Sequence, residues 1–160
     1  MKINAIDEYG LRILIRIAKS EGDEGLSISQ ISDQEGLSIP YVAKITRTLR
    51  AHNLINSTRG HKGGYVLARP ADQININEAL SALGGALYDP SFCGSHSGER
   101  KFCTNSIDCS VRSLWRMVQA SVNQILESVS IADLMGTEKN ATLRLQSMLD
   151  EITQNGKIEV

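Results

Sequence analysis

The three cysteines of the chain lie close together in sequence, and their thiols are the side chains best suited to chemistry. Cys93, Cys103 and Cys109 are separated by nine and then by five residues. This spacing differs from the paired Cys-x-x-Cys of a zinc ribbon or of a thioredoxin-like redox site. Three thiolates on one loop can hold an iron–sulfur cluster if a fourth ligand comes from elsewhere in the fold.

Two other interpretations of this cysteine loop stay open. His96 follows Cys93 by three residues, and it is a candidate fourth ligand for a cluster. Three cysteines and one histidine also make the closed tetrahedral site that zinc prefers. The last interpretation is three unrelated free thiols. A disulfide framework is not expected, because the number of cysteines is odd and cytosolic thiols stay reduced.

Apolar periodicity predicts three helices in the part of the chain before the cysteines. The first is expected over residues 6–18. The second begins at Ser27, which can form a capping box with Gln30, and it ends at Gly36. The third runs over about residues 38–52. A short helix, a tight turn and a longer helix are typical of a helix-turn-helix motif.

The third helix has an apolar inner stripe and a polar, basic outer face. Val42, Ile45 and Leu49 recur at helical spacing and are expected to face the core. Amide, hydroxyl and guanidinium groups on the other side can meet base edges and phosphates in a major groove. The candidate DNA-binding residues of this helix are Ser38, Tyr41, Lys44, Arg47 and Thr48.

A glycine-rich turn after this helix predicts a β-hairpin. Strand-like residues at 54–58 and 65–69 flank it, and glycines suit a hairpin tip that needs positive φ. The position of this hairpin directly after a helix-turn-helix favours the wing of a winged helix, and the alternative is an exposed hairpin with incidental charge. The candidate DNA-binding residues of the wing are Arg59, Lys62, Gly64 and Tyr65.

Charge is strongly segregated along the chain. The net charge is −1, yet residues 36–71 contain no Asp or Glu and carry six Lys or Arg side chains. Such segregation favours a polyanionic partner, here a double-stranded DNA operator. The alternative is a basic face that is simply solvated.

The strongest periodic signal in the chain follows Cys109. A heptad stripe of this kind usually pairs with its own copy, which favours a homodimer, and the alternative is that it packs on its own domain. A further amphipathic helix is expected over about residues 138–153, with no function assigned. The stripe consists of Val111, Trp115, Val118, Val122, Ile125 and Val129, and Leu114 and Leu126 widen it.

These patterns predict a mainly α fold with a small β-hairpin wing. We expect a winged helix-turn-helix domain over residues 1–84, the irregular cysteine loop over 85–109, a dimerisation helix over 110–134 and a helical tail over 135–160. No apolar run is long enough to cross a bilayer, and acidic residues interrupt the N-terminal segment before any signal-like stretch. We therefore expect a cytoplasmic protein that binds no membrane.

No catalytic constellation is evident, so an enzyme is not expected. No histidine accompanies a Ser or Cys nucleophile in a recognisable motif, and no paired acids form a pocket-like pattern. A function of another class, as an iron–sulfur carrier or redox protein, is the alternative to DNA binding.

Three stretches of the chain resemble the winged-helix iron–sulfur transcription regulators of the IscR, NsrR and RirA type. They are Asp-Glu-Tyr-Gly-Leu-Arg at residues 7–12, the predicted recognition helix at 38–49, and Arg-Gly-His-Lys-Gly-Gly-Tyr-Val-Leu-Ala-Arg-Pro at 59–70. The resemblance covers about residues 1–135 and leaves out the tail.

The resemblance implies a homodimer with crossed long helices, usually a repressor, that holds a 2Fe–2S or 4Fe–4S cluster near the dimer interface. Its three cysteines correspond to those of the cysteine loop. Glu8 stands where the NsrR branch has a carboxylate ligand in its first helix, whereas Arg112 stands where the IscR branch has a histidine. The cluster would sense iron, nitric oxide or redox state and control operator affinity. Structural zinc, or reactive thiols without metal, is the alternative.

Overall fold

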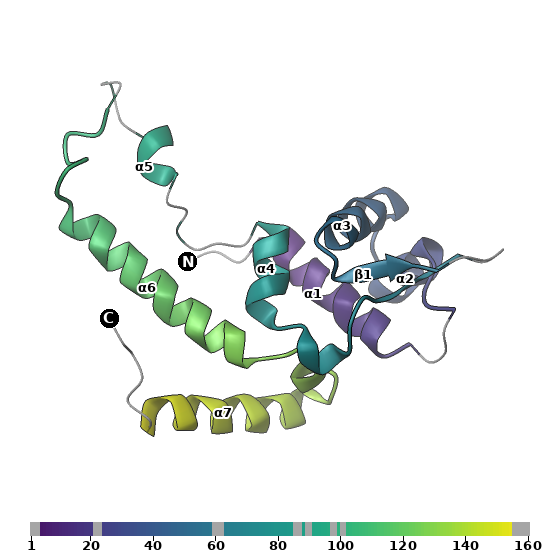
Figure 1. Ribbon diagram of the computed structural model, residues 1–160. Coiled ribbons are helices and arrows are strands. Elements are labelled where there is room, and N and C mark those ends of the chain that lie inside the picture. Colours follow the sequence, from purple (N-terminus) through teal and green to yellow (C-terminus); the bar gives the residue numbers. More distant parts are fainter. Residues whose placement is uncertain are drawn as a thin grey trace.

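The order of secondary-structure elements confirms a mainly α protein with one β-hairpin (Figure 1). The computed structural model describes residues 4–20, 24–58, 63–84, 88, 91–96, 99 and 102–154. Helices α1 to α4 and the hairpin form one body, and α6 extends from it as a long arm. The elements are α1 (Ala5–Ala18), α2 (Ile28–Glu35), α3 (Ile39–Ala51), β1 (Ile55–Ser57), β2 (Tyr65–Leu67), η1 (Ala71–Gln73), α4 (Ile76–Leu83), α5 (Phe92–Ser95), α6 (Ser110–Ser128), η2 (Ala132–Leu134) and α7 (Glu138–Gln154).

The predicted helix-turn-helix is present as α2, the turn at residues 36–38, and α3. The capping box is present as well, because the Gln30 amide donates to the Ser27 hydroxyl over 3.3 Å and the Ser27 amide donates to the Gln30 carboxamide over 2.9 Å. Gly36 ends α2 in the left-handed conformation, with φ 67°. Ser38 stands at the N-cap of α3, but its side chain makes no capping bond. Its backbone carbonyl and Pro40 in the first turn begin this helix instead.

A small antiparallel sheet forms the base of the wing. Strands β1 and β2 pair in register from Ile55 with Leu67 to Ser57 with Tyr65. Leu26 adds a third segment, since it exchanges backbone hydrogen bonds of 2.8 and 3.0 Å with Tyr65. The loop before α2 is thereby tied to the wing.

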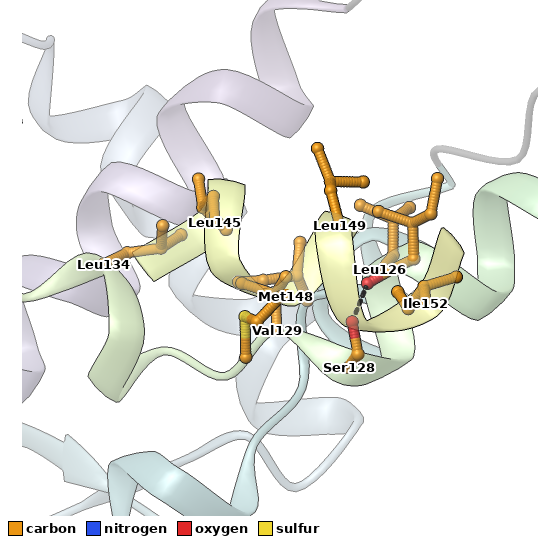
Figure 2. Close-up of a pocket in the computed structure, with 10 residues that line it drawn as sticks. Leu126, Ser128, Val129, Leu134, Leu145, Met148, Leu149 and Ile152 are labelled. Carbon is orange, nitrogen blue, oxygen red and sulfur yellow. Dashed lines mark hydrogen bonds between the residues drawn. The ribbon is translucent and has the colours of Figure 1, made fainter. Parts of the chain in front are cut away.

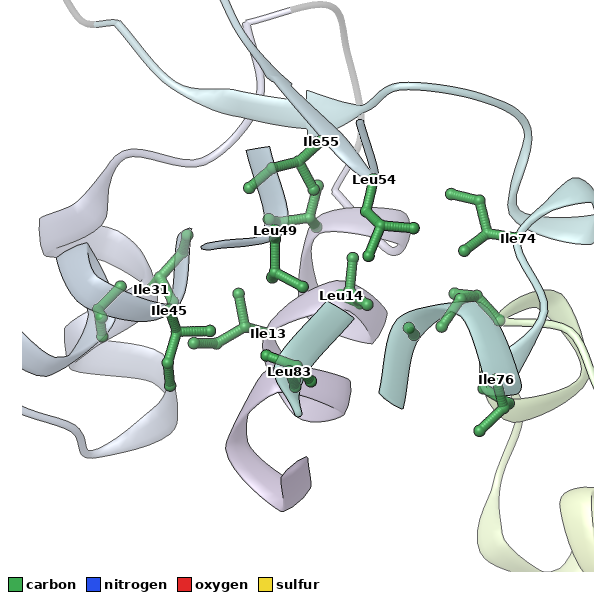
Figure 3. Close-up of a cluster of buried hydrophobic side chains, with 14 of the residues drawn as sticks. Ile13, Leu14, Ile31, Ile45, Leu49, Leu54, Ile55, Ile74, Ile76 and Leu83 are labelled. Atoms are coloured by element: carbon green, nitrogen blue, oxygen red, sulfur yellow. The ribbon is translucent and has the colours of Figure 1, made fainter. Parts of the chain in front are cut away.

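The core lies where α1, α3 and α4 meet below the hairpin (Figure 3). Helix α1 crosses α4 closely at Gly10, where an added Cβ would overlap a methyl group of Leu83. The inner stripe predicted for α3 is confirmed. Fully buried side chains include Ile13, Leu14, Ile31, Val42, Ile45, Leu49, Leu54, Ile55, Ile74 and Ile131.

The long segment between α4 and α6 contains one short helix, although the sequence predicts an irregular loop. Helix α5 spans only Phe92–Ser95. Cys93, the first cysteine of the loop, is the second residue of this helix. The loop ends at the start of α6. Helix α5 and residues 102–109 lie toward the start of α6, away from its end at Ser128 (Figure 1).

Helix α6 ends at Ser128, before the end at residue 134 that the sequence predicts. Val129 is extended, and residues 129–131 pair with residues 74–76 through backbone bonds of 2.8 and 2.9 Å. Val129 and Ile131 are β-branched, so they suit this short extended pairing and fill the core. Helix α7, the predicted tail helix, follows η2 and packs beside the base of α6.

None of the helices in the described part of the chain combines the length and the apolar character that a membrane span requires.

Candidate nucleic-acid interface and cysteine loop

The outer face of α3 presents the cationic side chains that the sequence predicts for DNA contact. Lys44 and Arg47 are exposed, and neither makes an ion pair with any residue that the structure describes. Ser38 is exposed, and Tyr41 and Thr48 are half-buried. The opposite face of the helix is buried in the core, so the outer face is free for a phosphate backbone.

The turn between α2 and α3 is fixed by hydrogen bonds from inside the motif. The Ser32 hydroxyl donates to the carbonyl of Leu37 over 2.5 Å, and the Leu37 amide donates to the Ser32 carbonyl over 3.1 Å. Ser32 itself is buried. The angle at which α3 leaves the turn is therefore set before any DNA is bound.

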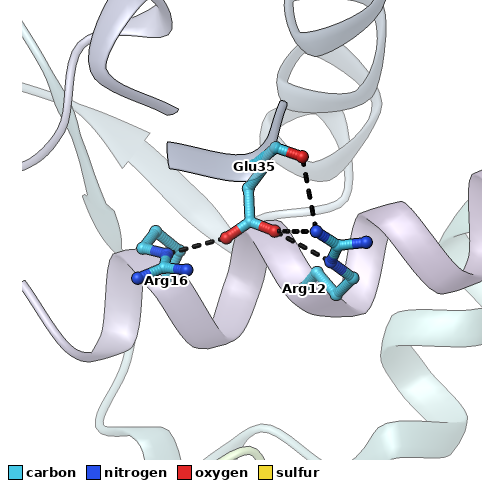
Figure 4. Close-up of polar contacts among 3 residues, drawn as sticks. All are labelled: Arg12, Arg16 and Glu35. Atoms are coloured by element: carbon cyan, nitrogen blue, oxygen red, sulfur yellow. Dashed lines mark hydrogen bonds and ion pairs between the residues drawn. The ribbon is translucent and has the colours of Figure 1, made fainter. Parts of the chain in front are cut away.

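Glu35, the last residue of α2, is held by two arginines of α1 (Figure 4). Its side chain is 3% exposed. One carboxylate oxygen accepts from Arg12 Nε over 2.8 Å, and the other accepts from Arg16 Nε over 2.7 Å. Arg12 also donates to the Glu35 backbone carbonyl over 3.3 Å. A buried carboxylate needs such partners, so these contacts join α1 to the end of α2.

An aromatic pair joins α1 to α3. The rings of Tyr9 and Tyr41 meet edge to face, with centroids 5.9 Å apart and planes at 86°. The guanidinium carbon of Arg12 lies 5.5 Å from the centroid of the Tyr9 ring. A cation over an aromatic face and an edge-to-face pair are both favourable contacts. Tyr41 is thus supported from α1.

The base of the wing depends on a close backbone approach. An added Cβ on Gly64 would lie 2.5 Å from the carbonyl oxygen of Glu24 and 2.9 Å from the carbonyl carbon of Gly25. Gly64 is buried and Tyr65 is half-buried, so both hold the wing rather than lie open on its surface. Arg59 and Lys62, the two predicted cations of the wing tip, lie outside the described residues.

The three cysteines are free and half-buried. Cys93 lies in α5, where its sulfur is 3.7 Å from the hydroxyl of Tyr88. That hydrogen bond raises the pKa of the Tyr88 phenol above its usual value. Cys109 is the N-cap of α6, and its sulfur accepts the backbone amide of Arg112 over 3.4 Å.

The predicted fourth ligands do not join the cysteines within one chain. Glu8 is exposed in the first turn of α1. His96 is exposed, stacks on Phe92 with ring centroids 4.1 Å apart, and has Nδ1 3.1 Å from the Phe92 carbonyl oxygen. Within the residues described, no three His, Cys, Asp or Glu side chains converge on a point that could hold a metal ion. In the described part of one chain, these side chains therefore do not form a cluster site or a zinc site.

The heptad stripe of α6 is divided between two environments. Leu126, near the end of the helix, and Val129, just after it, pack on the body of the same chain. Near its start, apolar side chains are exposed, with Val111 at 59%, Leu114 at 49% and Trp115 at 45%. The end of the stripe thus packs on its own domain, and its start is exposed in the single chain.

Helix α7 and the base of α6 border an apolar groove of about 270 Å³ (Figure 2). Ser128 is the one polar residue that lines it, among the residues the structure describes. Its hydroxyl is occupied, because it donates to the Ile125 carbonyl over 2.7 Å. The groove is lined by Ile76, Ile125, Leu126, Ser128, Val129, Leu134, Leu145, Met148, Leu149 and Ile152.

Sequence reasoning missed the link between Glu35 and the arginines of α1. Two signals were present. Arg12 and Arg16 are four residues apart, so they share one face of a helix, and Glu35 is an acidic residue directly before a helix-ending glycine. Neither segment alone indicates that the two meet, because residues 17–34 separate Arg16 from Glu35 in the sequence.

The chain matches a known family over most of its length. Residues 3–137 match Rrf2, described as iron-dependent transcriptional regulators. The chain is 32% identical over 135 residues to protein rrf2 of Nitratidesulfovibrio vulgaris, covering 84% of this chain and 87% of that protein. It is 27% identical over 139 residues to the HTH-type transcriptional regulator IscR of Sodalis glossinidius, covering 87% and 81%.

Solved structures of two regulators share this fold. CymR, the global cysteine regulator of B. subtilis, is 28% identical with a TM-score of 0.65, covering 84% of this chain and 96% of that one. IscR of T. potens is 27% identical with a TM-score of 0.63, covering 84% and 86%. The resemblance found in the sequence is confirmed, and the chain belongs to the Rrf2 family of helix-turn-helix transcriptional regulators.

Proposed function

We propose that this protein is a homodimeric repressor that acts in the cytoplasm and binds a two-fold DNA operator through α3. The observation that carries the proposal is the pair of exposed cations, Lys44 and Arg47, without ion-pair partners in the described part of the chain. They stand on a helix whose other face is fixed in the core. Ser38, Tyr41 and Thr48 add groups that can meet base edges and phosphates on the same side.

The wing supplies the second set of DNA contacts in this proposal. Arg59 and Lys62 would anchor it to phosphates or enter a minor groove. Gly64 and Tyr65 act at its base, because their backbone contacts with residues 24–26 fix the direction in which the hairpin leaves the body.

A second copy of the chain would cover the exposed start of α6. Three large apolar side chains at Val111, Leu114 and Trp115 are about half exposed in one chain. Exposed apolar patches of this kind mark interaction sites. A dimer would also present two α3 helices to the two halves of an operator.

The cysteine loop is the proposed sensor. Cys93, Cys103 and Cys109 are the candidate ligands of a 2Fe–2S or 4Fe–4S cluster, with Glu8 or His96 as the fourth ligand. Regulators named IscR are among the relatives of this chain. To bind a cluster, the loop would have to change conformation or a second copy would have to supply a ligand. In the described part of one chain, no three of these ligands lie close together.

A sensor of thiol chemistry without metal is the second candidate. Two sulfurs already have hydrogen-bond partners, Tyr88 for Cys93 and the amide of Arg112 for Cys109. The N-terminus of a helix also stabilises negative charge, and Cys109 caps a helix of 19 residues. The structural similarity to CymR, a cysteine regulator, favours this candidate as well.

Anaerobic purification with a visible spectrum and analysis of iron, sulfide and zinc separates these candidates. Iron with sulfide, lost in Cys103→Ala, would support the cluster. Zinc alone would support a structural metal site. Absence of metal, with loss of operator binding after thiol oxidation, would support the second candidate and remove the cluster.

DNA binding is tested on operator fragments selected with the purified protein. Lys44→Ala and Arg47→Ala should each weaken binding by about tenfold or more, because each removes a phosphate or base contact. Lys139→Ala is the matched control, since Lys139 is an exposed cation on α7, outside the helix-turn-helix. The slope of log K against log salt should fall by about 0.9 for each phosphate contact removed. Equal affinities for the wild type and both variants would remove α3 from the interface.

A further inference from the structure

Helix α1 reaches both halves of the helix-turn-helix through one side chain. Arg12 bonds the carboxylate and the backbone carbonyl of Glu35, the last residue before the turn. The same guanidinium lies over the ring of Tyr9, which meets the edge of Tyr41 on α3. Arg12 therefore contacts the end of α2 directly and the outer part of α3 through one aromatic ring.

We propose that Arg12 is a positioning residue that fixes Tyr41 and the start of α3 for DNA binding, through its contacts with Tyr9 and Glu35. The inference rests on the proposed function, because it assumes that α3 binds the operator. Tyr41 stands at the start of the outer face, so a tilt of its ring would move the first contacts of the helix. Arg12 itself need not touch DNA.

Arg16 allows this role to be separated from simple stabilisation. Both arginines stand on α1, both bond Glu35 at 2.7 to 2.8 Å, and their side chains are 43% and 42% exposed. Only Arg12 also lies over an aromatic ring in the part of the chain that the structure describes. Removal of either arginine should cost stability, and removal of Arg12 should cost more because Arg12 also bonds the Glu35 carbonyl and contacts Tyr9. Only removal of Arg12 should disturb Tyr9 and Tyr41.

The experiment compares Arg12→Ala with Arg16→Ala in the full-length protein, by thermal unfolding and by operator affinity. We expect Tm to fall in both variants, and to fall further in Arg12→Ala, so operator affinity is measured at a temperature at which both variants are folded. Operator affinity should fall about tenfold in Arg12→Ala, because the cation–aromatic contact with Tyr9 is lost and the edge-to-face contact of Tyr9 with Tyr41 is disturbed. In Arg16→Ala it should fall less than about threefold. Equal affinities of the two variants would overturn the proposal.

A second variant distinguishes positioning from a direct contact of Arg12 with phosphate. Tyr9→Leu keeps an apolar side chain and leaves both ion pairs of Glu35 in place, so it should fold, and it should also weaken binding. In the Tyr9→Leu background, Arg12→Ala should cost no more affinity than Arg16→Ala does. A tenfold loss that persists there would mean that Arg12 binds DNA itself, against the proposal. Failure of the wild type to bind any operator would instead contradict the proposed function.

Discussion

Ile131 donates its backbone amide to the carbonyl of Ile74 over 2.9 Å, and both side chains are fully buried. Ile74 precedes α4 in the body, and Ile131 comes just after the long arm of α6. The two residues thus connect the segment after α6 to the helix-turn-helix body through a backbone hydrogen bond and buried side chains. A displacement of the arm would reach α4, which packs on α1 and α3, through this short backbone pairing.

Removal of the Ile131 side chain should destabilise the packing between the end of α6 and the body. Ile131→Ala leaves a cavity in the core, and such changes cost about 2–5 kcal/mol. Chemical denaturation should therefore show a large loss in the free energy of unfolding. Ile107, which is 98% exposed in the cysteine loop, is the matched control. Ile107→Ala should change stability by less than about 0.5 kcal/mol, and a comparable loss would contradict the assigned core.

The wing should tolerate no side chain at Gly64. In Gly64→Ala the new methyl group would meet backbone atoms of residues 24–26 at 2.5 to 3.0 Å, and backbone cannot rotate away as a side chain can. We expect a loss of about 1–3 kcal/mol in stability and weaker operator binding. Gly94→Ala has nothing within 4 Å of the new group and should stay within about 1 kcal/mol of the wild type. Thermal unfolding and operator titration test both, and a wild-type-like Gly64→Ala would contradict this packing.

The junction between η2 and α7 should depend on pH through Asp133. Burial raises the pKa of this carboxyl, but hydrogen bonds from the Ser130 hydroxyl and amide and from Arg144 outweigh it, so the pKa is lowered in the fold. A lowered pKa stabilises the fold above the unfolded value of about 3.9, and that contribution is lost as pH falls through the folded value. Asp133→Asn should therefore cost about 1 kcal/mol at pH 7.

The same difference between wild type and Asp133→Asn should shrink below about pH 4, where the wild-type carboxyl also becomes neutral. Denaturation curves at several pH values measure it. Asp108→Asn, at an exposed loop position, is the control and should follow the wild type. If the stability difference between wild type and Asp133→Asn did not change with pH, the charge of Asp133 would not contribute to stability.

The start of α6 should control the oligomeric state. Leu114→Glu places a charge in the exposed apolar patch. It should convert the proposed dimer to a monomer, because a charge buried without a partner is strongly unfavourable. Leu143, which is 63% exposed on α7, is the matched control, and Leu143→Glu should leave the dimer intact. Sedimentation analysis of the wild type and the two variants measures their oligomeric states. A Leu114→Glu variant that stays dimeric would move the interface away from α6.

Local chemistry was sufficient to predict most helices of this chain. The capping box of Ser27 and Gln30, the helix-ending Gly36 and the apolar stripe of α3 all act within a few residues, and each is present. The cation-rich outer face of α3 follows from the same periodicity. These features depend on the order of residues along one element, which the sequence contains in full.

The end of α6 was not predictable from its heptad stripe. Helical spacing continues through Val129, but the chain becomes extended there because residues 74–76 offer backbone partners from another part of the fold. The stripe likewise gave no sign that its two halves have different surroundings. Contacts between distant segments decide such points, and periodicity within one segment does not record them.

The sequence by itself determined the family, the helix-turn-helix and the cysteine loop, because motifs, caps and apolar periods are properties of neighbouring residues. Only the tertiary structure decided that Glu35 is buried between Arg12 and Arg16, that Tyr9 supports Tyr41, and that the predicted metal ligands stay apart in one chain. The physical reason is the same in each case. Burial, ion pairing and metal coordination depend on distances in space, and residues far apart in sequence acquire those distances only when the helices pack.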